Sequence, residues 1–200
     1  MNSFLKITTI DKFDYNGKVV LLRLDINSPL DPVTKKIVNE NKIKKSLETI
    51  KDILAKNAKL VLITHQGDTL DYHNLIPLNE HAEKLSKFLG IQVNYIDDIG
   101  GPASQEAIKA LKPAEIVLLG NLKYLTEEVS TFENVVKLRP EEMLNTYLVR
   151  NLAPLIDYYV NDAFAAADNQ HFAGAMQDAS EVCAGGRLLI KEMNALNKIM

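Results

Sequence analysis

The chain lacks several features that would assign it to a specialised class of protein. Its single cysteine, Cys183, excludes an internal disulfide framework and indicates a reducing compartment. No run approaches the roughly 20 apolar residues of a membrane helix, and the N-terminus has no apolar signal-peptide core. The net charge is only -3, so broad nucleic-acid or anionic-membrane binding is not expected. These absences predict a cytoplasmic protein in which Cys183 is a buried structural thiol rather than a nucleophile.

Several motifs that bind phosphate, nucleotide or metal are also missing. The sequence contains no G-x-x-x-x-G-K-[ST] loop and no G-x-G-x-x-G fingerprint, and it has no serine nucleophile elbow. The four histidines show no metal-ligand spacing. His73 could share a metal with Asp71, but a solvated loop is the favoured interpretation, and no metal site is predicted.

The chain does contain enough apolar residues for a sizeable core, since 46% of its 200 residues are hydrophobic. No internal repeat or Gly/Ser/Pro-rich linker divides it. Short apolar runs without alternating polarity are typical of strands covered on both faces. Five such runs are predicted to be strands: Val19–Leu24, Leu60–Thr64, Gln92–Ile96, Ile116–Leu119 and Tyr158–Asn161.

Helical patterns lie between these runs, with apolar residues spaced three and four apart. Prolines suit the first turns of three of them, and Asn57 and Gly90 are candidate helix ends. The predicted helices are Asn41–Asn57, Pro77–Leu89, Pro102–Leu111 and Pro140–Leu152. Strands that alternate with helices predict right-handed crossovers, hence an α/β fold with a doubly wound parallel sheet. This fold is Rossmann-like, with helices on both faces and three layers.

In such sheets, ligands bind beyond the carboxyl ends of the strands. Polar side chains able to orient an anion follow several of the predicted strands, and Lys42 begins the first helix near the same rim. The strand-end residues include Arg23, Asp25, Asn27, His65, Asp68, Gly120, Asn121, Lys123, Asn161, Asp162, Asp168, Asn169 and His171. The sequence therefore predicts a site formed by segments far apart in the chain.

Read together, four segments resemble the N-terminal, substrate-binding lobe of phosphoglycerate kinases of the archaeal type. They are VVLLRLDINSPLD, ITHQGD, VLLGNLKY and NTYLVRNLAPLIDYYVNDAFAAA. The resemblance implies a lobe over residues 1–186 and a helix over 187–200 that leads, in the family, into a nucleotide lobe. It also implies phosphoryl transfer between 1,3-bisphosphoglycerate and ADP with Mg²⁺, in which this lobe holds the glycerate ligand. The 200 residues include no nucleotide lobe, so no cofactor and no catalysis are expected of them alone; Mg-ATP or Mg-ADP is expected only with such a lobe.

The resemblance assigns site residues position by position. Arg23, Asp25, Asn27 and His65 match the family's substrate-binding residues. Two lysines replace arginines, which keeps the charge but loses the two-pronged geometry. Lys42 is the candidate catalytic residue that neutralises the transferring phosphoryl group, and Lys123 is a candidate substrate ligand. Three aligned positions are altered: Asp68 and Asn169 stand for arginines, and Asp168 stands for a histidine. The charges of Arg23, Lys42, Lys123, Asp68 and Asp168 sum to +1.

Two functions stay open on this reading. The chain could be the 3-phosphoglycerate-binding lobe of a kinase, with a nucleotide-binding lobe as its possible partner. Alternatively, it could be a degenerate stand-alone lobe that serves as a binding or interaction module. An unrelated doubly wound binding protein would require the motif matches to be chance. For single residues, a turn-forming role could explain Asp25 and Asn27, and Asn161 could serve only to pair loop backbone.

Overall fold

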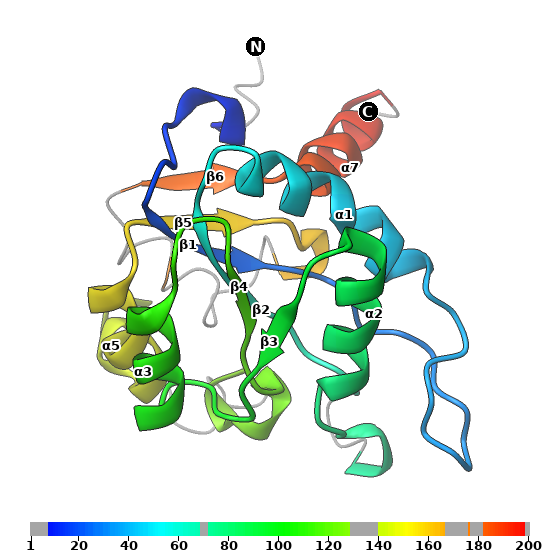
Figure 1. The fold of residues 1–200 in the computed structure, drawn as a ribbon. Helices are drawn as coiled ribbons and strands as arrows, with labels where there is room; N and C mark the ends of the chain where they lie inside the picture. Colours follow the sequence, from blue (N-terminus) through cyan, green and yellow to red (C-terminus); the bar gives the residue numbers. More distant parts are fainter. Residues whose placement is uncertain (1–7, 69–71, 129–139, 167–175, 177–181, 199–200) are drawn as a thin grey trace.

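The computed structural model describes residues 8–68, 72–128, 140–166, 176 and 182–198. Its centre is a six-stranded parallel sheet in the order β3-β4-β2-β1-β5-β6 (Figure 1). The strands are β1 Val19–Arg23, β2 Lys59–Ile63, β3 Val93–Tyr95, β4 Ile116–Leu118, β5 Tyr158–Asn161 and β6 Cys183–Gly185. The α-helices are α1 Asn41–Leu54, α2 Asn79–Leu89, α3 Pro102–Ala110, α5 Tyr147–Leu152 and α7 Arg187–Asn197.

The sheet confirms the predicted fold class and all five predicted strands, and it adds one more. β6 pairs with β5 at the edge of the sheet, with Cys183 opposite Tyr159 and Gly185 opposite Asn161. Burial raises the pKa of the Cys183 thiol to about 11, and its partly buried side chain packs against the core. Both observations suit a structural cysteine rather than a nucleophile.

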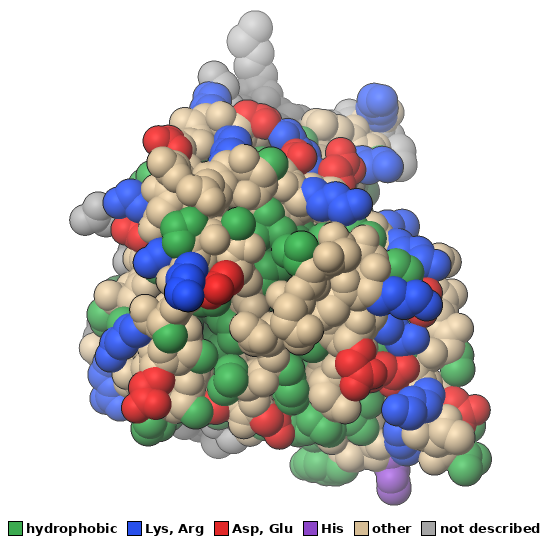
Figure 2. Space-filling model, in the orientation of Figure 1, with side chains coloured by type: hydrophobic (Ala, Val, Ile, Leu, Met, Phe, Trp, Pro, Cys, Tyr) green, Lys and Arg blue, Asp and Glu red, His purple; other side chains and the backbone are tan. Residues whose placement is uncertain are grey.

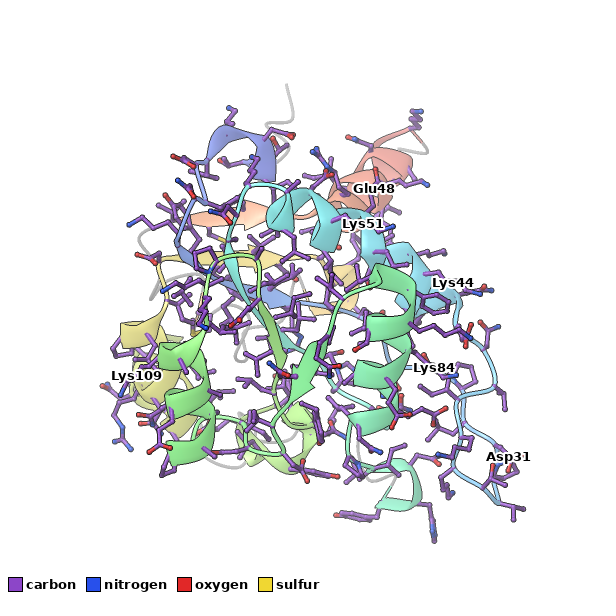
Figure 3. The ribbon with its side chains drawn as sticks, in the orientation of Figure 1. Asp31, Lys44, Glu48, Lys51, Lys84 and Lys109 are labelled. Carbon is purple, nitrogen blue, oxygen red and sulfur yellow. The ribbon has the colours of Figure 1, made fainter. Side chains whose placement is uncertain are left out.

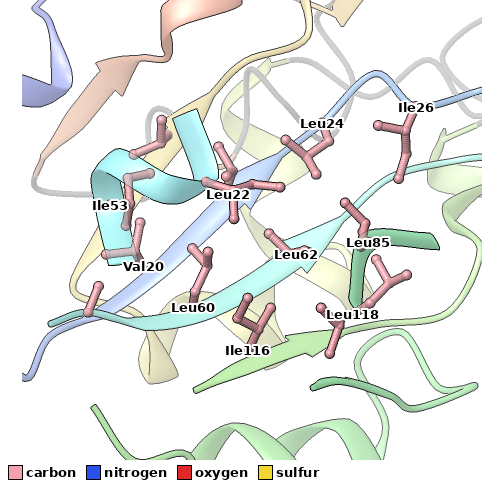
Figure 4. Close-up of a cluster of buried hydrophobic side chains, with 14 of the residues drawn as sticks. Val20, Leu22, Leu24, Ile26, Ile53, Leu60, Leu62, Leu85, Ile116 and Leu118 are labelled. Carbon is pink, nitrogen blue, oxygen red and sulfur yellow. The ribbon is translucent and has the colours of Figure 1, made fainter. Parts of the chain in front are cut away.

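The two faces of the sheet carry separate apolar clusters, which produces the three layers. Val20 and Leu22 point to one face and pack with residues of α1 and α2 such as Ile53 and Leu85 (Figure 4). Leu21 points to the other face and packs with residues of α3 and α5. Figure 1 shows α3 and α5 together on one side of the sheet and α1 and α2 on the other. Consecutive residues of β1 are therefore all buried, as the unbroken apolar run predicts.

Three of the four predicted helices form as single helices, with shifted ends. α1 ends at Leu54 with Ala55 as its C-cap, although Asn57 does adopt a left-handed conformation two residues later. α2 begins at Asn79 rather than Pro77, and Gly90 ends it as predicted, in a left-handed conformation.

The prediction of one continuous helix over Pro140–Leu152 was wrong. Residues Pro140–Asn145 form a 3-10 helix, Thr146 is extended, and α5 starts anew at Tyr147. The Glu127 carboxylate caps the start of α5, because it accepts the backbone N–H groups of Tyr147 (2.7 Å) and Leu148 (3.1 Å). These are two of the donors that the first turn of a helix leaves unpaired.

The segment before α1 projects from the sheet and is held by polar contacts. Asp31 lies far out on this segment and accepts the N–H of Thr34 at 2.6 Å (Figure 3). At its other end, Glu40 binds Lys44 of α1 (3.2 Å) and Lys84 of α2 (2.9 Å). Figure 2 shows positive and negative side chains interspersed over the visible face of the molecule. In the part of the chain that is described, no helix is long and apolar enough to span a lipid bilayer.

The C-terminal helix α7 packs against α1 through a compact set of ion pairs. The Arg187 side chain binds Asp52 of α1 through Nε (2.7 Å) and Asp11 through Nη1 (2.7 Å). The backbone N–H of Arg187 also donates to Thr49 Oγ1 at 2.9 Å. The helix expected over residues 187–200 is present from residue 187 to residue 197, and these contacts hold its first turn against α1.

Candidate anion-binding site

The sheet brings the predicted strand-end residues to one edge. Arg23, the last residue of β1, is in register with Ile63 of β2 and Asn161 of β5. Beyond β4, the backbone N–H of Leu122 donates to Thr64 O at 3.1 Å, which places Lys123 beside the end of β2. The carboxyl ends of four neighbouring strands, β4, β2, β1 and β5, therefore lie side by side at one edge of the sheet, as the parallel topology requires.

Lys42 lies in the first turn of α1, above this edge, and is paired with a second predicted site residue. Its Nζ atom lies 3.0 Å from Asp25 Oδ1 and 2.9 Å from Asp25 Oδ2. The Lys42 side chain is 48% exposed and the Asp25 side chain 23% exposed. A pair this open to solvent contributes little to stability, so an incoming anion can compete for the lysine at low cost.

Arg23 occupies a different environment from the one expected of an exposed anion ligand. Its side chain is 2% exposed, and Nη2 donates to Oε1 of Glu128, which is 5% exposed. Burial alone would lower the pKa of Arg23, but the charge and hydrogen bond of Glu128 raise this pKa above its ordinary value. The sequence-based charge count therefore omitted a carboxylate: Glu128 balances Arg23 within the protein.

His65 follows β2 and lies among the three cations of the site. Burial lowers the pKa of His65 to about 3, and the positive charges of Arg23, Lys123 and Lys42 lower it in the same direction. The imidazole is therefore neutral throughout the physiological range. The structure thus places Arg23, His65 and Lys123 at neighbouring strand ends, with Lys42 held beyond β1 by Asp25, although their sequence positions span 100 residues.

Amide side chains brace the loops of this edge. Asn27 exchanges two hydrogen bonds with the backbone of Gly67, each 3.2 Å long. Gln66 does the same with the backbone of Ser28, at 2.9 Å in both directions. Asn121 accepts the Gln66 N–H at 3.1 Å and donates to the Gln66 carbonyl at 2.9 Å. Asn27, predicted to bind substrate, therefore also holds the loop after β2 in place.

His81 is a buried residue of this network that sequence analysis did not identify. It lies on α2, is fully buried, and its Nε2 atom is 3.1 Å from Gln66 Oε1. Burial lowers its pKa to about 4, which keeps the ring neutral. The helical spacing that marks Leu78 and Leu85 as core residues could have included His81, because it lies three residues after Leu78 and four residues before Leu85.

The loop after β5 is described only in part. Asn161 Oδ1 accepts the N–H of Ala163 at 2.9 Å, which supports a backbone-pairing role for this asparagine. Asp68 is exposed at the rim of the site. Asp168, Asn169 and His171 lie outside the described residues.

Asp162, beside Asn161, is a buried carboxylate that caps α7. Its Oδ1 atom accepts the N–H groups of Leu188 (2.9 Å) and Leu189 (3.2 Å). Gly186 makes room for it, because an added Cβ there would lie 2.8 Å from the Asp162 Cβ. Burial raises the pKa of Asp162 to about 6, although hydrogen bonds from Thr49 and from the first turn of α7 oppose this change.

The raised pKa predicts a pH dependence of folding. Folding favours protonated Asp162, so the stability from this group is full below about pH 4 and is lost as the pH rises through about 6. Raising a pKa from 3.8 to about 6 corresponds to on the order of 2–3 kcal/mol. Asp162→Asn should remove this slope and should be no less stable than the wild type at about pH 7.

The measurement is urea unfolding of both proteins at several pH values across this window. Asp14→Asn, at an exposed position, is the control and should retain the wild-type slope. An unchanged slope in Asp162→Asn would contradict the assigned pKa.

The described residues contain no group of three or more His, Cys, Asp or Glu side chains that could hold a metal ion. The charged groups of the site are instead suited to an anion with several oxygens. Lys42 and Lys123 supply positive charge, and neutral His65 can supply a hydrogen-bond donor.

Comparison with known proteins gives one consistent result. The profile of the family described as Phosphoglycerate kinase matches residues 10–200. The phosphoglycerate kinase of Sulfurisphaera tokodaii is 40% identical over 98% of this chain and 45% of its own length. That of Methanothermus fervidus is 36% identical over 98% of this chain and 46% of its own length.

Solved structures agree with the sequence relatives. The crystal structure of phosphoglycerate kinase from Pyrococcus horikoshii superposes with a TM-score of 0.85 at 35% identity, covering 96% of this chain and 45% of that one. The chain thus spans about half the length of the curated relatives it matches, which is consistent with the N-terminal lobe. The chain belongs to the phosphoglycerate kinase family.

Proposed function

We propose that this chain is the glycerate-binding lobe of a cytoplasmic phosphoglycerate kinase, and that the edge formed by β1, β2 and β4 binds 3-phosphoglycerate. The observation that carries the proposal is the position of Lys123 beside neutral His65 at the strand ends of this edge, with Lys42 paired to Asp25 just beyond β1. Family membership gives this cluster its substrate class. Phosphoryl transfer depends mainly on positioning and on neutralising oxygen charge, which is the chemistry that these residues provide.

Each residue has a distinct role in this proposal. Lys42 leaves Asp25 and binds a terminal oxygen of the transferring phosphoryl group, while Lys123 binds the substrate from the β4 side. Asp25 and Asn27 orient the glycerate through their side-chain polar atoms. The family resemblance assigns the nucleotide and its Mg²⁺ to a second lobe, so we expect turnover only when this chain acts with such a partner lobe.

An NMR titration of the ¹⁵N-labelled chain with 3-phosphoglycerate tests the proposal. We expect shifts at Asn27, His65 and Lys123 at millimolar ligand. Lys42→Gln and Lys123→Gln should each weaken binding about tenfold or more, because a hydrogen bond to a charged group contributes about 1.5–3 kcal/mol. Lys109→Gln is the matched control, because this exposed lysine lies on α3 (Figure 3). Absence of shifts near the site would remove the proposal.

The second candidate is a degenerate lobe that acts as an interaction module. It is favoured by the internal pairing of two cations, Lys42 with Asp25 and Arg23 with Glu128, and by Asp68 at the rim. This candidate predicts a folded domain that does not bind 3-phosphoglycerate. Turnover after mixing the chain with a separate nucleotide lobe of the family would exclude it.

A further inference from the structure

Arg23 is enclosed by the protein rather than presented to a ligand. Its guanidinium is 2% exposed, and the Glu128 carboxylate that balances its charge is 5% exposed. The Nε and Nη1 atoms are also closed to solvent and have no hydrogen-bond partner among the described residues. An anion in solvent cannot reach these atoms unless part of the protein moves, so direct substrate binding is a poor explanation of Arg23.

The same guanidinium has a second neighbour inside the site. Arg23 Nη2 lies 3.4 Å from His65 Nδ1. Arginine has only donors, so in this contact Nδ1 must be the acceptor and cannot carry hydrogen. In a neutral imidazole the hydrogen is then on Nε2.

The resulting ring is well suited to an anionic ligand. Neutral His65 with hydrogen on Nε2 is a donor at that atom, whereas the other tautomer would direct a lone pair at the substrate. Lys123, beside the end of β2, and Lys42, paired with Asp25, supply positive charge at the same edge of the sheet.

We propose that Arg23 is a positioning residue, held in place by Glu128, which fixes His65 as an Nε2–H donor to a carboxylate or phosphate oxygen of the substrate. The identity of that substrate depends on the proposed function. The tautomer of His65 is independent of the proposed function, because the contact with Arg23 that sets it lies within the protein.

The first test is a long-range ¹H–¹⁵N spectrum of the histidine rings in the ligand-free chain. Only four histidines are present, and His65→Gln identifies the signals of His65 by their loss. We expect an unprotonated Nδ1 and a protonated Nε2, unchanged between about pH 5 and pH 8. A proton on Nδ1, or a ring that gains a second proton in this range, would overturn the proposal.

The second test separates positioning from direct contact. Arg23→Met combined with Glu128→Leu removes both buried charges, which avoids leaving one of them unpaired. In this double variant we expect the His65 ring to become a mixture of tautomers, whereas Lys109→Gln should leave it unchanged. A double variant that keeps pure Nε2–H would show that Arg23 does not set the tautomer.

Binding of 3-phosphoglycerate supplies the final comparison. If Arg23 acts through His65, then His65→Gln and the double variant should weaken binding to a similar extent, and their combination should weaken it no further. Additive losses would instead indicate that Arg23 touches the substrate. A wild-type chain with the expected tautomer but no affinity for 3-phosphoglycerate would refute the proposed function and leave this inference standing.

Discussion

Replacing Glu128 by glutamine is expected to lower the free energy of unfolding by about 3–5 kcal/mol, the range typical of a buried ion pair that loses one partner. The change keeps the size of the side chain but leaves the Arg23 guanidinium, 2% exposed, without its counter-charge. Arginine does not escape this cost by losing its proton, because its pKa is too high. The whole cost of the unpaired charge should therefore appear as a lower free energy of unfolding.

Urea unfolding followed by circular dichroism measures this loss. Glu48→Gln, at an exposed position of α1, is the matched control and should change stability by less than about 0.5 kcal/mol. The double variant Arg23→Met, Glu128→Leu should recover most of the stability, because it leaves no buried charge unpaired. If Glu128→Gln were as stable as Glu48→Gln, the ion pair would not be buried as described.

Replacing Asn121 by alanine is expected to cost about 3 kcal/mol, because it leaves several buried backbone groups without partners. The Asn121 side chain accepts the N–H groups of Gln66 and Lys123, each at 3.1 Å. It also donates to the carbonyls of Gln66 (2.9 Å) and Ile76 (3.0 Å). One side chain thus connects the ends of β2 and β4 to the segment before α2.

The same unfolding experiment tests this prediction, with Asn94→Ala on the exposed face of β3 as the control. NMR spectra of the folded variant should show shifts at His65 and Gly67, since the loop after β2 loses its brace. A loss of stability below about 1 kcal/mol would mean that water replaces Asn121 at little cost.

The fold could be predicted from sequence wherever burial leaves a strong pattern. β1, β2 and β4 are covered on both faces, so their apolar runs are unbroken and easily identified. β6 was missed because its three residues, Cys-Ala-Gly, are small and lack the β-branched side chains typical of strands. The break at Thr146 was missed because Glu127, which caps the helix that starts after it, lies 20 residues from Tyr147 in sequence.

The position of the site followed from topology, but the environment of its residues did not. Parallel strands place their carboxyl ends together, so the sequence alone was enough to group Arg23, His65 and Lys123. The ion pair between Arg23 and Glu128 could not be predicted from the sequence. The two residues are 105 positions apart, and no periodic pattern connects them. An amide at a strand end, such as Asn121, has the same appearance in sequence whether it binds a ligand or braces a loop.

The purely parallel sheet also determines when the molecule can fold during synthesis. Among the strands that the structure describes, no neighbours are joined by a hairpin, and Val20 of β1 pairs with Tyr158 of β5. Such distant pairing is expected to slow folding, because long loops must close before their contacts are gained. During synthesis β1 leaves the ribosome before β5, so one edge of the strand that contains Leu21 and Leu22 stays unpaired. These apolar side chains are then available for misfolded contacts and for chaperones. The strand that carries Arg23 is therefore made well before β5, the neighbour that completes its pairing.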